Sequence, residues 1–119
     1  MKTEQVIQAL SALAQESRLA LFRLLVKRGP EGYTPGEISE RLEIPGPTLS
    51  FHLKTLAQVG LISARREGRH LHYSADFDRM NGIVGYLTEH CCSLASNCAP
   101  GECVPARIPA RIPARRKSA

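Results

Sequence analysis

Residues 34–60 decide the fold, and they read TPGEISERLEIPGPTLSFHLKTLAQVG. The first helix of this stretch should begin after Thr34, whose hydroxyl can accept a hydrogen bond from a free first-turn amide while Glu37 reaches back. Pro35 occupies the first helical position, where its missing N–H costs nothing. A turn of about four residues follows, and a second helix closes at Gly60. Two short helices joined by such a turn predict a helix-turn-helix.

The second helix of this pair, residues 47–60, has two contrasting faces. Leu49, Leu53 and Leu56 recur at spacings of four and three, so this stripe should pack inward. The opposite side carries small hydroxyls and a lysine, with no acidic residue, which suits a helix lying in a DNA groove. We expect the groove to be contacted by Pro47, Thr48, Ser50, Phe51 and Lys54.

Two aromatic side chains of this helix need separate interpretation. Phe51 is a large apolar residue turned away from the inner stripe. It either packs beneath the hairpin that follows or contacts a thymine methyl group in the groove. His52 borders the inner stripe and is expected to be a hydrogen-bonded structural histidine, not a metal ligand.

A β-hairpin should follow the helix pair. Residues 61–66 and 69–74 have the composition of two strands, and Glu67-Gly68 between them suits a tight turn. Such a hairpin beside a helix-turn-helix would be a wing. Its tip is rich in arginines, which we expect to contact the DNA backbone: Arg65, Arg66 and Arg69.

Three further helices are expected, over residues 3–14, 17–28 and 76–90. In the last of them apolar residues recur at intervals of three and four residues, the pattern of a packed seam. These residues are Phe77, Met80, Ile83, Val84 and Leu87. The predicted fold class is mainly α with a small β-hairpin, a winged helix-turn-helix that forms a homodimer through its first and last helices.

All four cysteines fall within thirteen residues just after the last predicted helix: Cys91, Cys92, Cys98 and Cys103. The start of the chain is polar and no apolar run could cross a bilayer, so we expect a soluble cytoplasmic protein without a membrane partner. The cytosol keeps thiols reduced, which favours a metal-binding or reactive role over structural disulfides. A thiol cluster beside a DNA-binding unit predicts a sensor.

The net charge of +5 comes from the end of the chain. Residues 1–103 are neutral, with eleven basic and eleven acidic residues, whereas five basic residues follow, three of them in a repeated Pro-Ala-Arg-Ile pattern. A proline at every fourth position forbids a helix. The predicted organisation is a DNA-binding and dimerisation domain over 1–90, a cysteine-rich inducer segment over 91–103, and a disordered basic tail over 104–119. The tail either aids solubility or attracts phosphates weakly.

The chain resembles the ArsR/SmtB family of winged-helix repressors over about residues 4–92. The resemblance rests on TLSFHLKTL at residues 48–56, on Gly60-Leu61-Ile62, on Arg66-Glu67-Gly68-Arg69 and on Tyr73. It implies a homodimeric repressor of double-stranded operator DNA that is released when a toxic metal or metalloid binds.

Members of this family sense at different places. The arsenic site of one branch lies in the first helix of the helix-turn-helix, but residues 36–42 contain no cysteine. Zinc and nickel sites use Asp and His pairs on the last helix, whose Asp76, Glu89 and His90 lack that spacing. What remains resembles the arsenic-responsive branch with thiols after the last helix. The implied As(III) ligands are Cys91, Cys92 and Cys98, with Cys103 a spare, an alternative third thiol or a fourth zinc ligand.

Other functions stay open at this point. The same cysteines could serve a repressor selective for methylarsenite, one that senses zinc or cadmium, or a disulfide-based redox switch. A thiol enzyme such as an arsenate reductase needs C-x-x-C, or a cysteine leading a phosphate-binding loop, and the chain has neither. We therefore expect arsenite, with antimonite as an alternative inducer, no permanent cofactor and no enzymatic activity.

Overall fold

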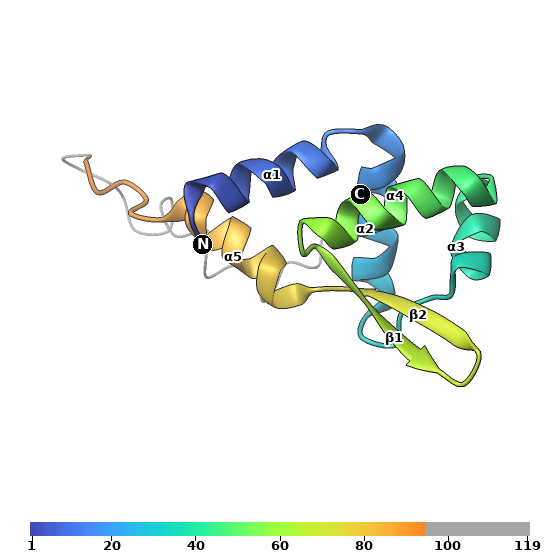
Figure 1. Cartoon of the computed structure of the whole chain (residues 1–119). Coiled ribbons are helices and arrows are strands. Elements are labelled where there is room, and N and C mark those ends of the chain that lie inside the picture. The colour runs from blue at the N-terminus through green and yellow to red at the C-terminus, as the bar shows by residue number, and fades with distance from the viewer. Residues whose placement is uncertain (95–119) are drawn as a thin grey trace.

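The computed structural model describes residues 1–94, which form a helical body with one hairpin projecting from it (Figure 1). In chain order the elements are α1 (Thr3–Leu13), α2 (Glu16–Arg28), α3 (Pro35–Leu42), α4 (Gly46–Gln58), β1 (Ile62–Glu67), β2 (His70–Ala75) and α5 (Phe77–Thr88). Helices α3 and α4 are the helix-turn-helix, and the antiparallel pair β1–β2 is the wing. The predicted fold class, mainly α with a small hairpin, is confirmed. No helix within these residues is long and apolar enough to span a bilayer.

The start of α3 has the predicted capping box. The Thr34 backbone N–H donates to the Glu37 carboxylate at 2.9 Å, and the Glu37 N–H donates to the Thr34 hydroxyl at 3.3 Å. The hydrogen bond from the Thr34 backbone lowers the pKa of Glu37. At the other end Glu43 takes a left-handed conformation, with φ of 55°, and the chain turns into α4. These local interactions set where the helix-turn-helix begins and how it turns.

The core lies under the helix-turn-helix. Its largest fully buried side chains are Leu21, Leu25, Ile38, Leu49, Leu56 and Leu61. They come from α2, α3, α4 and the residue just before the wing, so α2 is central, as its apolar residues predict. Burying each such side chain contributes about 1.5–3 kcal/mol, which is what fixes α4 against the body.

The hairpin differs from the prediction by one residue. The strands pair Ile62 with Ala75 at the base and Glu67 with His70 at the tip. The two turn residues are therefore Gly68 and Arg69, and the predicted turn at Glu67-Gly68 was wrong. The φ of Gly68 is +63° and that of Arg69 is not positive. A type II′ turn requires glycine at the first turn position, which explains the shift.

The helix ends agree with the predictions to within two residues. The largest differences are two residues at the C-terminal ends of α4, expected over 47–60 and spanning Gly46–Gln58, and of α5, expected over 76–90 and spanning Phe77–Thr88. Asp76 is its N-cap and accepts a hydrogen bond from the Arg79 N–H at 3.0 Å. After Thr88 the chain leaves helical geometry, because Glu89 has φ of −56° and ψ of 132°.

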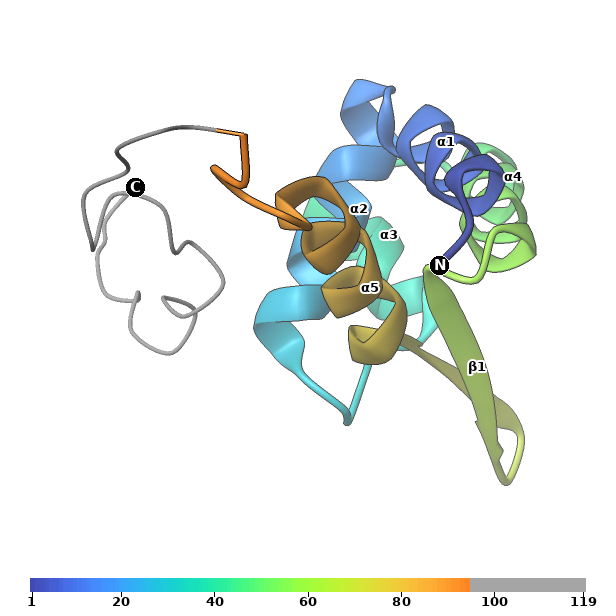
Figure 2. The same ribbon diagram turned by 90° about the vertical axis from the view of Figure 1, so that its left-hand side faces the viewer.

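Helices α1 and α5 lie next to each other, away from α3 and the wing (Figures 1 and 2). The Thr3 and Tyr86 hydroxyls form a hydrogen bond between them. Of the predicted seam on α5 only Ile83 is buried; Val84 and Leu87 are 49% and 61% exposed. Ile7 and Leu10 on α1 are also exposed. The seam therefore offers apolar surface that the rest of residues 1–94 does not cover.

Candidate DNA-binding surface and thiol segment

Helix α4 presents its predicted groove residues to solvent. Its inner side buries Leu49, Leu53 and Leu56 against the core. All five residues expected in the groove are exposed: Pro47, Thr48, Ser50, Phe51 and Lys54. Because the first turn of α4 has no acidic residue, this surface carries no negative side chain that would repel phosphates. The geometry is that of a helix able to enter a major groove.

Phe51 is not packed beneath the wing. Its side chain is 62% exposed, and its nearest aromatic neighbour is His52, with ring centroids 6.0 Å apart. Packing under the hairpin, one of the two alternatives, is therefore wrong. Contact with a thymine methyl stays a prediction.

His52 is structural, as expected, but it is not fully hydrogen-bonded. Its side chain is buried on the inner face of α4, and its Nδ1 atom has no hydrogen-bond partner within the described residues. Burial lowers the pKa of His52 below its usual 6.5, and the nearby positive charge of Arg18 lowers it further. A buried nitrogen without a partner costs stability, so this position is a weak point beneath the DNA-facing side of α4.

The three wing arginines are exposed but differ in their contacts. Arg66 and Arg69 line a hollow of about 450 Å³ between the wing and the start of α3, and within residues 1–94 neither forms an ion pair. Arg65 instead contacts the protein itself. Its guanidinium donates to the backbone carbonyls of Pro30 and Glu31, both at 3.3 Å, and forms an ion pair with Glu67.

Sequence reasoning missed Tyr33, which lies at the junction of the wing and the helices. Its backbone forms an isolated bridge with Tyr73 of β2. The guanidinium groups of Arg28 and Arg41 lie over its ring, at 4.8 and 4.7 Å from the centroid. The sequence gives little signal for this cluster, since Arg28 and Arg41 lie five and eight residues from Tyr33 and spacing alone does not bring them together.

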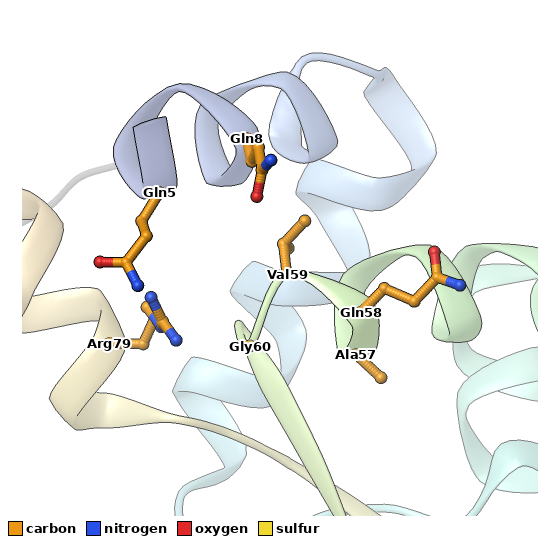
Figure 3. A pocket seen from close by; sticks show the side chains of 7 residues that line it. All are labelled: Gln5, Gln8, Ala57, Gln58, Val59, Gly60 and Arg79. Atoms are coloured by element: carbon orange, nitrogen blue, oxygen red, sulfur yellow. The ribbon is translucent and has the colours of Figure 1, made fainter. Parts of the chain in front are cut away.

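A hollow of about 250 Å³ lies where α1, the end of α4 and α5 meet (Figure 3). Gln5 from α1 and Arg79 from α5 extend into it, and Gly60 lines it. Gly60 has φ of +81°, and a Cβ at this position would lie 2.8 Å from Arg79 Nη2. The exit of α4 toward the wing is thus in close contact with α5.

The thiol segment, of which the structure describes residues 89–94, begins where α5 ends. The Cys91 N–H donates to the Thr88 carbonyl at 3.0 Å, and His90 and Cys92 both have positive φ, of 58° and 60°. Such values are uncommon for residues other than glycine, and they place this turn outside regular helix. The backbone of this turn has left the helix.

The two described cysteines lie side by side. Cys91 is an exposed free thiol and Cys92 is disulfide-bonded; their Sγ atoms are 3.6 Å apart. Two further predicted ligands, Cys98 and Cys103, and the basic tail over 104–119 lie outside the described residues. Within residues 1–94 no three metal-ligating side chains gather into one group. Two of the expected sulfur ligands therefore lie close together, Cys91 as a thiol and Cys92 within a disulfide.

Comparison with known proteins identifies the family. Residues 13–64 match a family model described as a helix-turn-helix domain. The chain is 40% identical over 81 residues to the HTH-type transcriptional regulator YceK of Bacillus subtilis, covering 67% of this chain and 80% of that protein. The solution structure of Mb0332 from Mycobacterium bovis, a homodimeric winged helix-turn-helix domain and possible ArsR-family regulator, superimposes with a TM-score of 0.59 at 25% identity. That match covers 81% of this chain and 89% of Mb0332.

The chain belongs to the ArsR family. It is 37% identical over 92 residues to a probable mercury resistance operon repressor of Streptomyces lividans, covering 77% of this chain and 69% of that one. It is 29% identical over 96 residues to the arsenical resistance operon repressor of Bacillus subtilis, covering 81% and 87%. This ArsR-family protein is therefore a DNA-binding transcriptional regulator and not an enzyme.

Proposed function

We propose that this ArsR-family regulator is a homodimeric repressor that releases its operator when trivalent arsenic binds Cys91, Cys92 and Cys98. The observation that carries the proposal is the pair of adjacent sulfurs, 3.6 Å apart, immediately beyond α5. Thiolates are soft ligands, and As(III) binds three of them in a pyramid. Antimonite has similar chemistry and is a further candidate inducer.

The DNA-binding half of the proposal rests on α4 and the wing. The exposed groove residues read the operator, and Arg66 and Arg69 contact its phosphates. Two copies related by a two-fold axis require half-sites about one helical turn apart, on the order of 34–36 Å. The operator should therefore be an imperfect inverted repeat.

The exposed apolar residues of α1 and α5 support the dimer. Ile7, Val84 and Leu87 are all about half exposed or more, a costly arrangement for a chain that stays alone. The homodimeric state of Mb0332, which has the same fold, points the same way. We infer that these two helices form the dimer interface.

The inducer must meet reduced thiols. The disulfide at Cys92 has to be reduced before that sulfur can bind arsenic, because the thiolate is the ligand. We expect a transcriptional regulator to act in the cytoplasm, where glutathione and thioredoxin keep thiols reduced. Binding releases the thiol protons, so occupancy should fall at low pH.

The contacts of α5 supply a route from the thiols to the DNA-binding surface. Tyr86 bonds to Thr3 of α1 one turn before the thiol segment, and Arg79 lies against the exit of α4 at Gly60. Gathering sulfurs at the end of α5 would shift this helix and with it the two α4 helices of the dimer. Allosteric coupling is typically about 1–3 kcal/mol, and about 5.5 kcal/mol converts a population from 1:99 to 99:1.

The test is DNA release measured against arsenite, methylarsenite, antimonite, zinc, cadmium and mercury(II), with reduced protein and a labelled operator. Release by arsenite at the lowest concentration supports the proposal. Preference for methylarsenite would indicate a two-thiol site, and preference for zinc or cadmium would indicate a four-ligand site that includes Cys103.

Mercury(II) is the second candidate inducer. The mercury resistance repressor of Streptomyces lividans is more similar in sequence, at 37% identity, than the arsenical one at 29%. Mercury(II) needs only two thiolates, and Cys91 with Cys92 offers two. Full release of a Cys98→Ser variant by mercury(II), without release by arsenite, would favour this alternative.

A further inference from the structure

Arg65 fastens the wing to the turn between α2 and α3. Its Nη1 donates to the Pro30 carbonyl and its Nη2 to the Glu31 carbonyl, both at 3.3 Å. Its Nε donates to the Glu67 carboxylate at 3.2 Å, and Nη2 lies 3.2 Å from the same oxygen. All three guanidinium nitrogens therefore have partners inside the protein. The carboxylate of Glu67 also balances the charge of Arg65.

The same turn is held against the second strand of the wing. Tyr33 and Tyr73 exchange both backbone hydrogen bonds, at 3.0 and 2.8 Å. The preceding Gly32 lies so close that a Cβ there would be 2.3 Å from the Tyr73 carbonyl oxygen. Arg65 on β1 and Tyr73 on β2 thus attach both strands to one turn.

The turn between α2 and α3 is also attached to the helix-turn-helix. Arg41 of α3 lies over the Tyr33 ring, as does Arg28 from the end of α2. The Arg28 Nε also donates to the Gly32 carbonyl at 3.0 Å. A continuous set of contacts therefore runs from the wing through this turn to α3. These contacts join the wing to the helix-turn-helix.

We propose that Arg65 is a positioning residue for DNA binding, which holds the wing where Arg66 and Arg69 reach the phosphates. It does not itself contact phosphate. The contrast among the three arginines supports this assignment: Arg65 is engaged by carbonyls and a carboxylate, whereas its two neighbours form no ion pair within residues 1–94. The inference rests on the proposed DNA binding through the wing.

The salt dependence of binding separates the two roles. A side chain that neutralises a phosphate releases a counterion. Removing that side chain therefore makes the negative slope of log K against log salt shallower by about 0.9. When a residue that only pre-orders the wing is removed, the Arg66 and Arg69 contacts still form in the complex but at an ordering cost, so the affinity falls and this slope stays the same. Replacement by lysine adds a second distinction. Lysine restores a phosphate contact through its charge, but its single ammonium lacks the planar fork that joins two carbonyls and a carboxylate.

The experiment compares full-length Arg65→Met and Arg65→Lys with Arg66→Met as the matched control. Operator affinity is measured over a salt series, and amide exchange at Tyr33 and Tyr73 is measured in the free protein. Both Arg65 variants should bind about three- to tenfold more weakly with the wild-type slope, and should exchange faster at these two amides. Arg66→Met should lower the slope by about 0.9 and leave the exchange unchanged.

Three outcomes would overturn the assignment. They are a slope lowered by about one in Arg65→Met, wild-type affinity in Arg65→Lys, or unchanged exchange in both variants. If the wild-type protein binds no operator, the proposed function fails. The exchange measurement then still decides whether Arg65 holds the wing, so the two failures are distinguishable.

Discussion

The helix-turn-helix with its wing and the thiol segment are held in place by different interactions. Over residues 34–75 the backbone is set by a capping box, a buried leucine stripe and a paired hairpin. Residues 89–94 are all exposed, and two of them, His90 and Cys92, have positive φ although neither is glycine. One region is ordered by its own packing, and the other has little packing to order it.

This difference fits the two proposed tasks, DNA binding and metalloid sensing. A surface that reads DNA must present its side chains in one arrangement, because base contacts are lost with small displacements. A metalloid site must gather sulfurs that start apart, and the regions that move in allostery come from the less stable parts of a fold. The contrast leads to five predictions, which compare the packed region with the thiol segment and the tail.

The largest effect should come from the packed region. Leu56→Ala removes a fully buried side chain of α4 and should lower the free energy of unfolding by about 2–5 kcal/mol. Denaturant unfolding measures it. Leu94→Ala, at a fully exposed position in the thiol segment, is the matched control and should change stability little. Similar losses from both would show that the two regions do not differ in packing.

Replacing a thiol should affect sensing alone. Serine at Cys91, Cys92 or Cys98 should leave repression intact and remove the arsenite response, a coupling of about 1–3 kcal/mol. Cys103→Ser is the control and should respond nearly as the wild type does. The readout is operator release titrated with arsenite. A normal response from Cys98→Ser would contradict the three-thiol site and point to a two-thiol inducer.

Single cations on the DNA-facing surface should contribute separately. Lys54→Ala should weaken operator binding, and Arg66→Ala should weaken binding to all DNA sequences while lowering the salt slope by about one. Fluorescence anisotropy at several salt concentrations measures both. After allowance for its weaker operator binding, neither variant should change the arsenite concentration that gives half-maximal release. A changed arsenite response would mean that the two regions are not separate.

His52 should make stability depend on pH. Because burial lowers the pKa of His52 in the folded state, the unfolded chain binds its proton first, at about pH 6.5. Stability should therefore fall as the pH drops below about 6.5 and continue to fall until it passes the folded pKa. Urea unfolding at pH 7.5 and 5.5 measures this, with His52→Leu showing a smaller difference. An equal pH dependence in the variant would assign it to other groups.

The smallest effect should come from the tail. Deleting residues 105–119 removes only prolines, small residues and five screened charges, besides two isoleucines. Arsenite-driven release should be unchanged, and operator affinity should fall modestly and only at low salt. Loss of the response in the shortened protein would show that the tail takes part in sensing.

Local signals predicted most of the fold. The capping box at Thr34 and the leucine spacing in α4 act between near neighbours, and both are confirmed in the structure. The hairpin turn was misplaced by one residue, because Gly68 can serve at either turn position and only the pairing of Glu67 with His70 decides. Periodicity likewise placed His52 on the inner side of α4 but could not show that its Nδ1 lacks a partner.

The sequence by itself determined the winged helix-turn-helix, the outward side of α4 and the cysteine cluster after the last helix, because each depends on the order of nearby residues. Only the tertiary structure showed which wing arginine is held by partners within the protein. Arg65 and Arg66 are adjacent in the chain and alike in chemistry, yet Arg65 meets carbonyls more than thirty residues away at Pro30 and Glu31. No local pattern encodes that contact, since it exists only once the wing folds back onto the turn between α2 and α3.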